Sequence, residues 1–120
     1  MSNEAPILDA DVIAELRESV GGDQSFVVEL ASTFLGEGPD YVRALEDALA
    51  RGDITAAVRA AHTLKSSSAA LGAMRLSEIS RSIENAARQG RIDGLVDAVA
   101  DVTAVWEQTV AAMKERGLVG

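Results

Sequence analysis

Residues 54–72, ITAAVRAAHTLKSSSAALG, decide the fold, because they are typical of one helix with a single core-facing side. At 100° per residue, the core-facing positions cluster on that side; they are Ile54, Ala57, Ala61, Leu64, Ser68 and Leu71. The glycine at position 72 suits a helix end. His62, the only histidine of the chain, lies about 130° from the centre of the apolar side. The pattern therefore predicts a packed helix, about Ile54 to Leu71, with an outward-facing imidazole.

The same region is the least acidic part of an acidic protein. The chain has 19 Asp and Glu residues and a formal net charge of −8, yet none of these acids falls within residues 54–77. Arg59, Lys65, Arg75 and the single histidine, His62, all lie in this gap. Acids near the imidazole would repel an incoming anion. The gap indicates a site for an anionic group.

Outward from this stretch, the chain repeats the helical pattern between short glycine-containing breaks. The expected helices span about 9–20, 23–35, 39–51, 54–71, 75–89 and 93–116. Asp9, Asp23 and Asp53 suit N-caps. The stretch 36–40, GEGPD, breaks the pattern, and its proline suits the first turn of a new helix.

These elements predict an all-α protein with no strand-like alternation. The two-residue link at 52–53 forces an antiparallel helical hairpin. We expect an antiparallel four-helix bundle made by the last four helices, with two additional N-terminal helices packed across one end or side. Residues 1–6 are expected to form a flexible N-terminal arm, and residues 7–120 a single helical domain.

Composition excludes several classes of function. Cysteine is absent, so disulfides, thiolate chemistry and cysteine-ligated zinc are ruled out. The negative net charge disfavours nucleic acid and anionic membranes as partners, because both would repel the chain. No apolar run approaches the ~20 residues of a membrane span, and the N-terminus lacks the pattern of a signal peptide. These features favour a cytoplasmic, monomeric protein.

Three ordinary interpretations of His62 compete with an anion site. An isolated surface histidine is usually only solvated, and Arg59 and Lys65 are compatible with ordinary surface charges. A metal site would need a second histidine, a cysteine or a carboxylate near His62, and the adjacent sequence supplies none. A hydrolytic triad is disfavoured because only Ser66 of the nearby serines shares the face of the histidine and no acid is expected to orient the ring. A neutral exposed imidazole is, however, a competent nucleophile.

The segment 62–73, HTLKSSSAALGA, closely resembles the signature of histidine-containing phosphotransfer (HPt) domains, roughly H-x-L-K-G-S-[SA]-x-x-[LIF]-G. Residues 21–26 and Phe34-Leu35 also resemble the opening helices of that family. Two positions depart from the pattern: Ser66 replaces the usual glycine, and Ala70 replaces a frequent asparagine. The resemblance implies a four-helix bundle with additional helices.

The resemblance also implies a phosphorelay intermediate without autonomous kinase activity. His62 would accept a phosphoryl group from an aspartyl phosphate of one receiver domain and pass it to the aspartate of another. Lys65 would offset the added negative charge, and the small residues Ser66 and Ala69 would allow a close approach. No cofactor or metal of its own is implied, since the receiver would bring Mg²⁺. The expected partners are receiver domains of a hybrid histidine kinase, of response regulators, or of both.

The partner surface is expected to include Arg59, Ser66 and Ala69 beside the histidine, and Phe34 and Leu35 of the second helix. For Phe34 and Leu35, a place in the core is an equal alternative. Two other functions remain open at this point. One is a non-catalytic module that sequesters response regulators by binding their receivers, and the other is a structural bundle with an incidental histidine.

Overall fold

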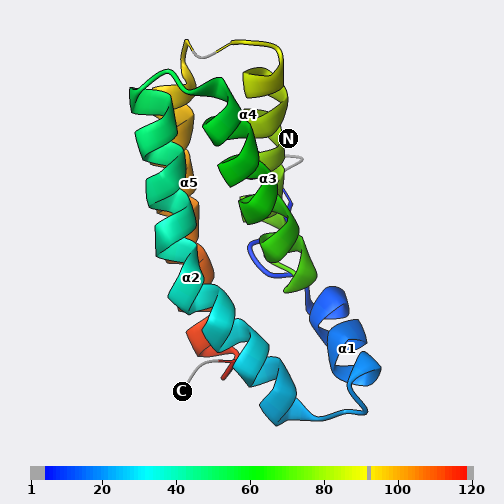
Figure 1. Ribbon diagram of the computed structural model, residues 1–120. Coiled ribbons are helices and arrows are strands. Elements are labelled where there is room, and N and C mark those ends of the chain that lie inside the picture. Colours follow the sequence, from blue (N-terminus) through cyan, green and yellow to red (C-terminus); the bar gives the residue numbers. More distant parts are fainter. Residues whose placement is uncertain (1–4, 92, 119–120) are drawn as a thin grey trace.

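Five helices make up the part of the chain that the computed structural model describes, residues 5–91 and 93–118 (Figure 1). In chain order they are α1 (Ala10–Ser19), α2 (Gln24–Ala50), α3 (Ile54–Ala70), α4 (Met74–Arg88) and α5 (Leu95–Glu115). Within these ranges there is no strand, so the all-α prediction is confirmed. The expected count of six helices is wrong, and so is the expectation of two N-terminal helices ahead of the bundle.

Helices α2 to α5 pack in a closed ring. Both α2 and α4 contact α3 and α5, while α1 packs against α2. In Figure 1 the short helix α1 extends beyond one end of the α3–α4 pair. The backbone N–H of Asp9 donates to the carbonyl oxygen of Gly72 at 2.8 Å, which ties the start of α1 to the end of α3. One helix, not two, therefore precedes the four-helix ring.

Aspartates begin the first three helices, as the sequence predicts. The Asp9 carboxylate accepts hydrogen bonds from the N–H groups of Asp11 and Val12, and the Asp23 carboxylate accepts one from Ser25. Asp53 accepts one from the N–H of the third residue of α3. Each bond satisfies a backbone donor that has no partner inside the helix. The Asp53 cap lies in the turn between α2 and α3, the hairpin that carries the site.

The stretch 36–40 does not end a helix, because α2 continues through it to Ala50. Gly38 is buried, and a Cβ added to it would overlap the ring of Trp106 on α5. The same indole packs against Phe34, with ring centroids 5.2 Å apart. The glycine therefore allows close approach of two helices. Tertiary packing keeps Pro39 inside a helix despite its missing N–H.

Only part of the expected N-terminal arm, residues 1–6, is described. Residues 1–4 lie outside the described residues. The carbonyl oxygens of Ala5 and Pro6 accept hydrogen bonds from the Arg75 side chain and backbone N–H, both at 2.9 Å. The described end of the arm therefore rests against the first turn of α4.

The core lies between the four helices of the ring and is almost entirely aliphatic. Leu45, Leu64, Leu76 and Ile83 are among its largest fully buried side chains. One expectation about the core is wrong in detail, since Ile54 is 38% exposed at the start of α3. The buried face of α4 includes two serines and a glutamate beside its aliphatic side chains. The buried glutamate matters for the site.

Candidate functional site

His62 projects from the middle of α3, away from the core. Its side chain is 56% exposed, whereas Ala61 and Leu64 on either side are fully buried. The outward direction predicted from helical periodicity is therefore confirmed. Lys65, one turn further along the helix, is more shielded, with a side chain that is 28% exposed. Both side chains lie on the part of α3 that packs against α4.

A buried carboxylate from α4 lies directly against the imidazole. Glu84 Oε2 is 3.0 Å from His62 Nδ1, and the Glu84 side chain is only 4% exposed. The expectation that no acid orients the ring is wrong. It considered only residues close to His62 in sequence, whereas Glu84 reaches the ring from the adjacent helix, and α3 and α4 pack against each other extensively.

Two cations complete a cluster around this carboxylate. The Lys65 ammonium lies 2.7 Å from Glu84 Oε1, an ion pair without hydrogen-bond geometry. The Arg88 guanidinium donates to Glu84 Oε2 through Nη2 at 2.8 Å and Nε at 3.2 Å. With His62 neutral, the cluster has two positive charges and one negative charge. A net charge of +1 therefore surrounds the histidine in a protein of net charge −8.

Glu84 is ionised throughout the physiological pH range. Its burial raises its pKa, but Lys65, Arg88 and His62 together outweigh burial and lower the pKa from 4.5 to about 2. An ionised carboxylate can only accept hydrogen bonds. The proton of the neutral imidazole therefore sits on Nδ1, and the lone pair sits on Nε2. Among the described residues, no hydrogen-bond partner of Nε2 is found.

The other small and basic residues predicted at the site lie on the exposed part of α3. Ser66 is exposed and Ala69 half-buried, so neither places a bulky side chain beside the imidazole. Arg59 is exposed one turn before the histidine. It lines a hollow of about 430 Å³ between α2 and α3, together with Thr63 and Asp47. None of the three predicted residues belongs to the charged cluster.

The two predicted contact residues of α2 differ in their surroundings. Phe34 is 5% exposed and packs on Trp106, which leaves little of its surface for a partner. Leu35 is partly buried and packs against the core. Phe34 thus serves mainly the interior.

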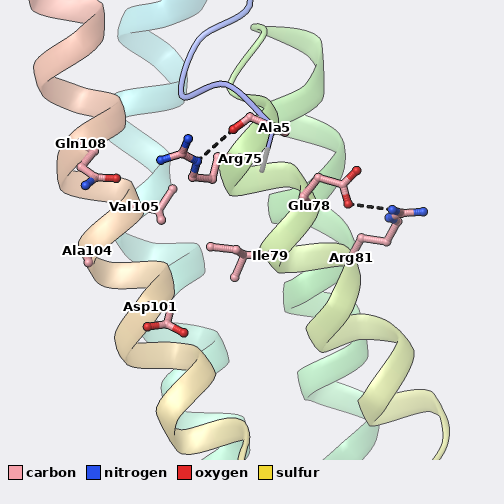
Figure 2. Close-up of a pocket in the computed structure, with 9 residues that line it drawn as sticks. All are labelled: Ala5, Arg75, Glu78, Ile79, Arg81, Asp101, Ala104, Val105 and Gln108. Atoms are coloured by element: carbon pink, nitrogen blue, oxygen red, sulfur yellow. Dashed lines mark hydrogen bonds and ion pairs between the residues drawn. The ribbon is translucent and has the colours of Figure 1, made fainter. Parts of the chain in front are cut away.

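A groove on another face of the molecule lies away from the histidine. It has a volume of about 740 Å³ and opens between α4 and α5, where Arg75, Glu78, Arg81 and Asp101 line it (Figure 2). Two of its charged residues are already paired, since Arg81 donates to Glu78 at 2.7 Å. The groove shares no residue with the cluster around His62. The side chain of His62 is itself 56% exposed, so the histidine site lies on an open surface.

The described residues include no group of three or more His, Cys, Asp or Glu side chains placed to hold a metal ion. In the same part of the chain, no helix has both the length and the apolar character to cross a membrane.

Comparison with known proteins gives the chain a family. The family model of the Hpt domain matches residues 29–116, which include α3 and the whole charged cluster. This chain belongs to the Hpt domain family. A crystal structure of histidine-containing phosphotransfer protein B from Pseudomonas aeruginosa PAO1 superposes on this Hpt domain with a TM-score of 0.82. The two chains are 26% identical, and the match covers 94% of this chain and 96% of the other. Among curated protein sequences, the comparison found no match to this Hpt domain.

Membership makes this Hpt domain a histidine phosphotransfer protein of a phosphorelay. Hpt domains are phosphocarriers and not kinases, and they work with receiver domains and kinases. The structure adds Glu84 and Arg88, which sequence reasoning missed. Little in the sequence indicates that Glu84 is buried, because it lies about 100° around the helix from its neighbour Ile83. Arg88 follows Glu84 at i+4, which is the spacing of an ion pair on a helix.

Proposed function

We propose that His62 accepts a phosphoryl group on Nε2 from the aspartyl phosphate of one receiver domain and passes it to the aspartate of another. The observation that supports this most strongly is an exposed imidazole whose Nδ1 is held by an ionised, buried carboxylate. That arrangement leaves Nε2 as the nucleophile and directs it away from the core.

In the forward step, the Nε2 lone pair attacks phosphorus, and an N–P bond forms while the P–O bond to the receiver aspartate breaks. The aspartate leaves as a carboxylate. The proton stays on Nδ1, so the phosphorylated ring carries a positive charge. The Glu84 carboxylate stabilises this charge at 3.0 Å, much as the buried aspartate of a catalytic triad stabilises an imidazolium. Onward transfer reverses these steps, with the neutral imidazole as leaving group.

Lys65 and Arg88 supply the positive charge that the phosphoryl group meets. Both are partly exposed, at 28% and 58% for their side chains, and both are held near the ring by Glu84. Ser66 and Ala69 are small enough to let the receiver approach closely, and Arg59 extends the positive surface. Mg²⁺ is expected on the receiver and not on this chain. We also propose that the protein acts as a cytoplasmic monomer without kinase activity of its own.

Phosphorylation of purified protein tests this proposal. Wild type should gain acid-labile, base-stable phosphate both from phosphoramidate and from a receiver domain phosphorylated with acetyl phosphate. His62→Gln should gain none. Equal labelling of His62→Gln, or no labelling of wild type by either donor, would refute phosphotransfer through His62. Receiver binding without labelling would instead support the alternative, a module that sequesters response regulators.

A further inference from the structure

A buried serine near the start of α4 holds the backbone of the helix that carries the histidine. The hydroxyl of Ser77 donates to the carbonyl oxygen of Lys65 on α3 at 3.0 Å, and Ser77 is only 8% exposed. The ammonium of Lys65 also lies 2.7 Å from Glu84 Oε1, on the same helix as the serine. Helix α4 therefore holds Lys65 at two points, once through its backbone and once through its side chain.

Ser77 and Glu84 lie on the same side of α4. They are seven residues apart, which places them about 20° apart around the helix and about 10.5 Å apart along its axis. Ser77 contacts α3 through its hydroxyl, and Glu84 contacts it through its carboxylate. The two helical turns between them form a rigid spacer, so the place where Ser77 bonds to α3 determines where Glu84 meets that helix.

The rest of the contact between α3 and α4 gives less directional control. Apart from Ser77 and Glu84, the buried residues of these two helices are alanine, serine, leucine and isoleucine. Burial of apolar surface has no preferred direction, and small side chains form shallow ridges. A hydrogen bond weakens steeply as its geometry worsens. Small shifts of α4 along α3 are therefore resisted mainly by the directional contacts, and the Ser77 bond is the one that lies away from the imidazole.

We propose that Ser77 is a positioning residue for phosphotransfer, which acts through Glu84. Its bond to Lys65 fixes the alignment of α4 on α3, and this alignment keeps the Glu84 carboxylate 3.0 Å from His62 Nδ1. Without the bond, the carboxylate aligns less well with Nδ1, and neutral rings with the proton on Nε2 become populated. Such a ring has no lone pair on Nε2 and cannot attack phosphorus. The proposal rests on the proposed function and names a residue that controls the same site.

Ser80 provides a matched comparison on the same helix. It is fully buried, and its hydroxyl donates to the carbonyl oxygen of Leu76 at 2.8 Å, within α4 itself. Ser77→Ala and Ser80→Ala remove the same atom from buried positions, but only Ser77→Ala removes a bond between helices. Ser77→Thr keeps the hydroxyl and should rescue the function, whereas Ser77→Cys keeps the size of the side chain with a much weaker donor.

Nitrogen NMR of the imidazole reports the effect on the ring directly. His62 is the only histidine of the chain, so its ring signals are unambiguous. In the neutral wild-type ring, Nδ1 should be protonated and Nε2 should not, which gives two well-separated nitrogen shifts. In Ser77→Ala and Ser77→Cys the two shifts should move toward each other, because the share of the tautomer with the proton on Nε2 rises severalfold. Ser80→Ala and Ser77→Thr should match wild type.

Single-turnover transfer from a receiver domain, phosphorylated with acetyl phosphate, gives the functional readout. Ser77→Ala should slow transfer by about two- to tenfold, which is the effect of weakening one hydrogen bond to the ring. Ser80→Ala should keep the wild-type rate. Wild-type tautomers and rates in both Ser77→Ala and Ser77→Cys, or equal changes in Ser80→Ala, overturn the proposal. If Ser77→Ala does not fold, Ser77→Cys decides by the same two measurements.

The tautomer spectra separate failure of this proposal from failure of the proposed function, since they need neither a phosphoryl donor nor a receiver. If wild type is labelled at His62 but neither Ser77→Ala nor Ser77→Cys shifts the tautomers, the role of Ser77 alone is refuted. A tautomer shift without slower transfer also overturns it. If wild type is labelled by neither phosphoramidate nor the receiver, the failure belongs to the proposed function, and the spectra still decide whether Ser77 aligns Glu84 with the ring.

Discussion

Replacing Glu84 with glutamine separates the hydrogen bond on His62 from the charge behind it. The amide oxygen of glutamine still accepts the Nδ1 proton, but it carries no negative charge. A hydrogen bond to a charged group contributes about 1.5–3 kcal/mol, against about 0.5–1.5 kcal/mol for a neutral pair. The phosphorylated ring is positive, so Glu84→Gln should raise the barrier by about 1–2 kcal/mol. Transfer should then slow by about five- to thirtyfold.

Glu84→Gln also frees two cations from their ion pairs with the carboxylate, and these cations should make transfer faster. Without the carboxylate, the ammonium of Lys65 and the guanidinium of Arg88 attract the phosphoryl group more strongly. Their side chains are 28% and 58% exposed, however, so solvent and salt screen much of that attraction. The ring charge, held at 3.0 Å by a carboxylate that is 4% exposed, is screened less. Slower transfer is therefore the expected outcome.

Single-turnover transfer from a phosphorylated receiver measures this effect. The matched control is Glu78→Gln on the same helix, where the carboxylate is 49% exposed and pairs only with Arg81 among the described residues. That control should leave transfer unchanged. If Glu84→Gln transfers as fast as wild type, or faster, then the carboxylate does not stabilise the ring and serves only to hold the two cations.

Glu84→Gln should also change how the free energy of unfolding depends on pH. The pKa of Glu84 is lowered by folding from 4.5 to about 2, so its ionised form stabilises the fold fully above pH 4.5. That contribution is lost as the pH falls from about 4.5 toward 2. It amounts to about 1–2 kcal/mol once solvent screening of the exposed cations is allowed for. In urea unfolding at pH 7, 4 and 3, wild type should lose this stability and Glu84→Gln should not. Parallel declines would contradict the assignment.

Two further substitutions test other parts of the structure. Lys65→Ala removes the 2.7 Å ion pair with Glu84. The variant should keep the fold, while its phosphohistidine should become shorter-lived or transfer its phosphoryl group several-fold more slowly. An unchanged lifetime and rate, measured by decay of labelled protein, would leave Lys65 without a role in transfer. Gly38→Ala places a Cβ against Trp106 and should destabilise the protein by about 1–3 kcal/mol in thermal unfolding. Gly36→Ala, which meets no atom within 4 Å, should be neutral or stabilising by up to about 1 kcal/mol, and equal losses in both variants would show that the indole contact is unimportant.

Most of the fold could be predicted because its helix boundaries depend on local chemistry. An N-cap needs only an aspartate and the N–H groups two or three residues later, and Asp9, Asp23 and Asp53 all make such bonds. The missed continuation of α2 depends on a distant residue. Nothing within residues 36–40 indicates that Trp106 packs over Gly38. Helix ends set by neighbours in sequence were predictable, and a helix sustained by another helix was not.

The same distinction, between features set by one segment and features set by contacts between helices, applies to the candidate site. The exposure of His62 follows from the periodicity of its own helix, so it could be predicted from one segment. Its tautomer could not, because that depends on Glu84, 22 residues away in sequence. In the sequence, Glu84 lies about 100° around the helix from Ile83, so neither its burial nor the residue of α3 opposite it could be predicted.

The acid-free segment around His62 acquires a different meaning once Glu84 is placed. The site does contain an acid, but that acid is buried and outnumbered by two cations, so the local charge is +1 in a chain of net charge −8. In the proposed function, acidic faces of the chain repel an approaching aspartyl phosphate, whereas this locally positive site attracts it. In the proposed mechanism, the Glu84 carboxylate thus fixes the tautomer of the nucleophile and holds Lys65 and Arg88 close to the phosphoryl group. A second acid beside His62 on α3 would cancel the local excess of positive charge, which gives a physical reason why the sequence next to the histidine has none.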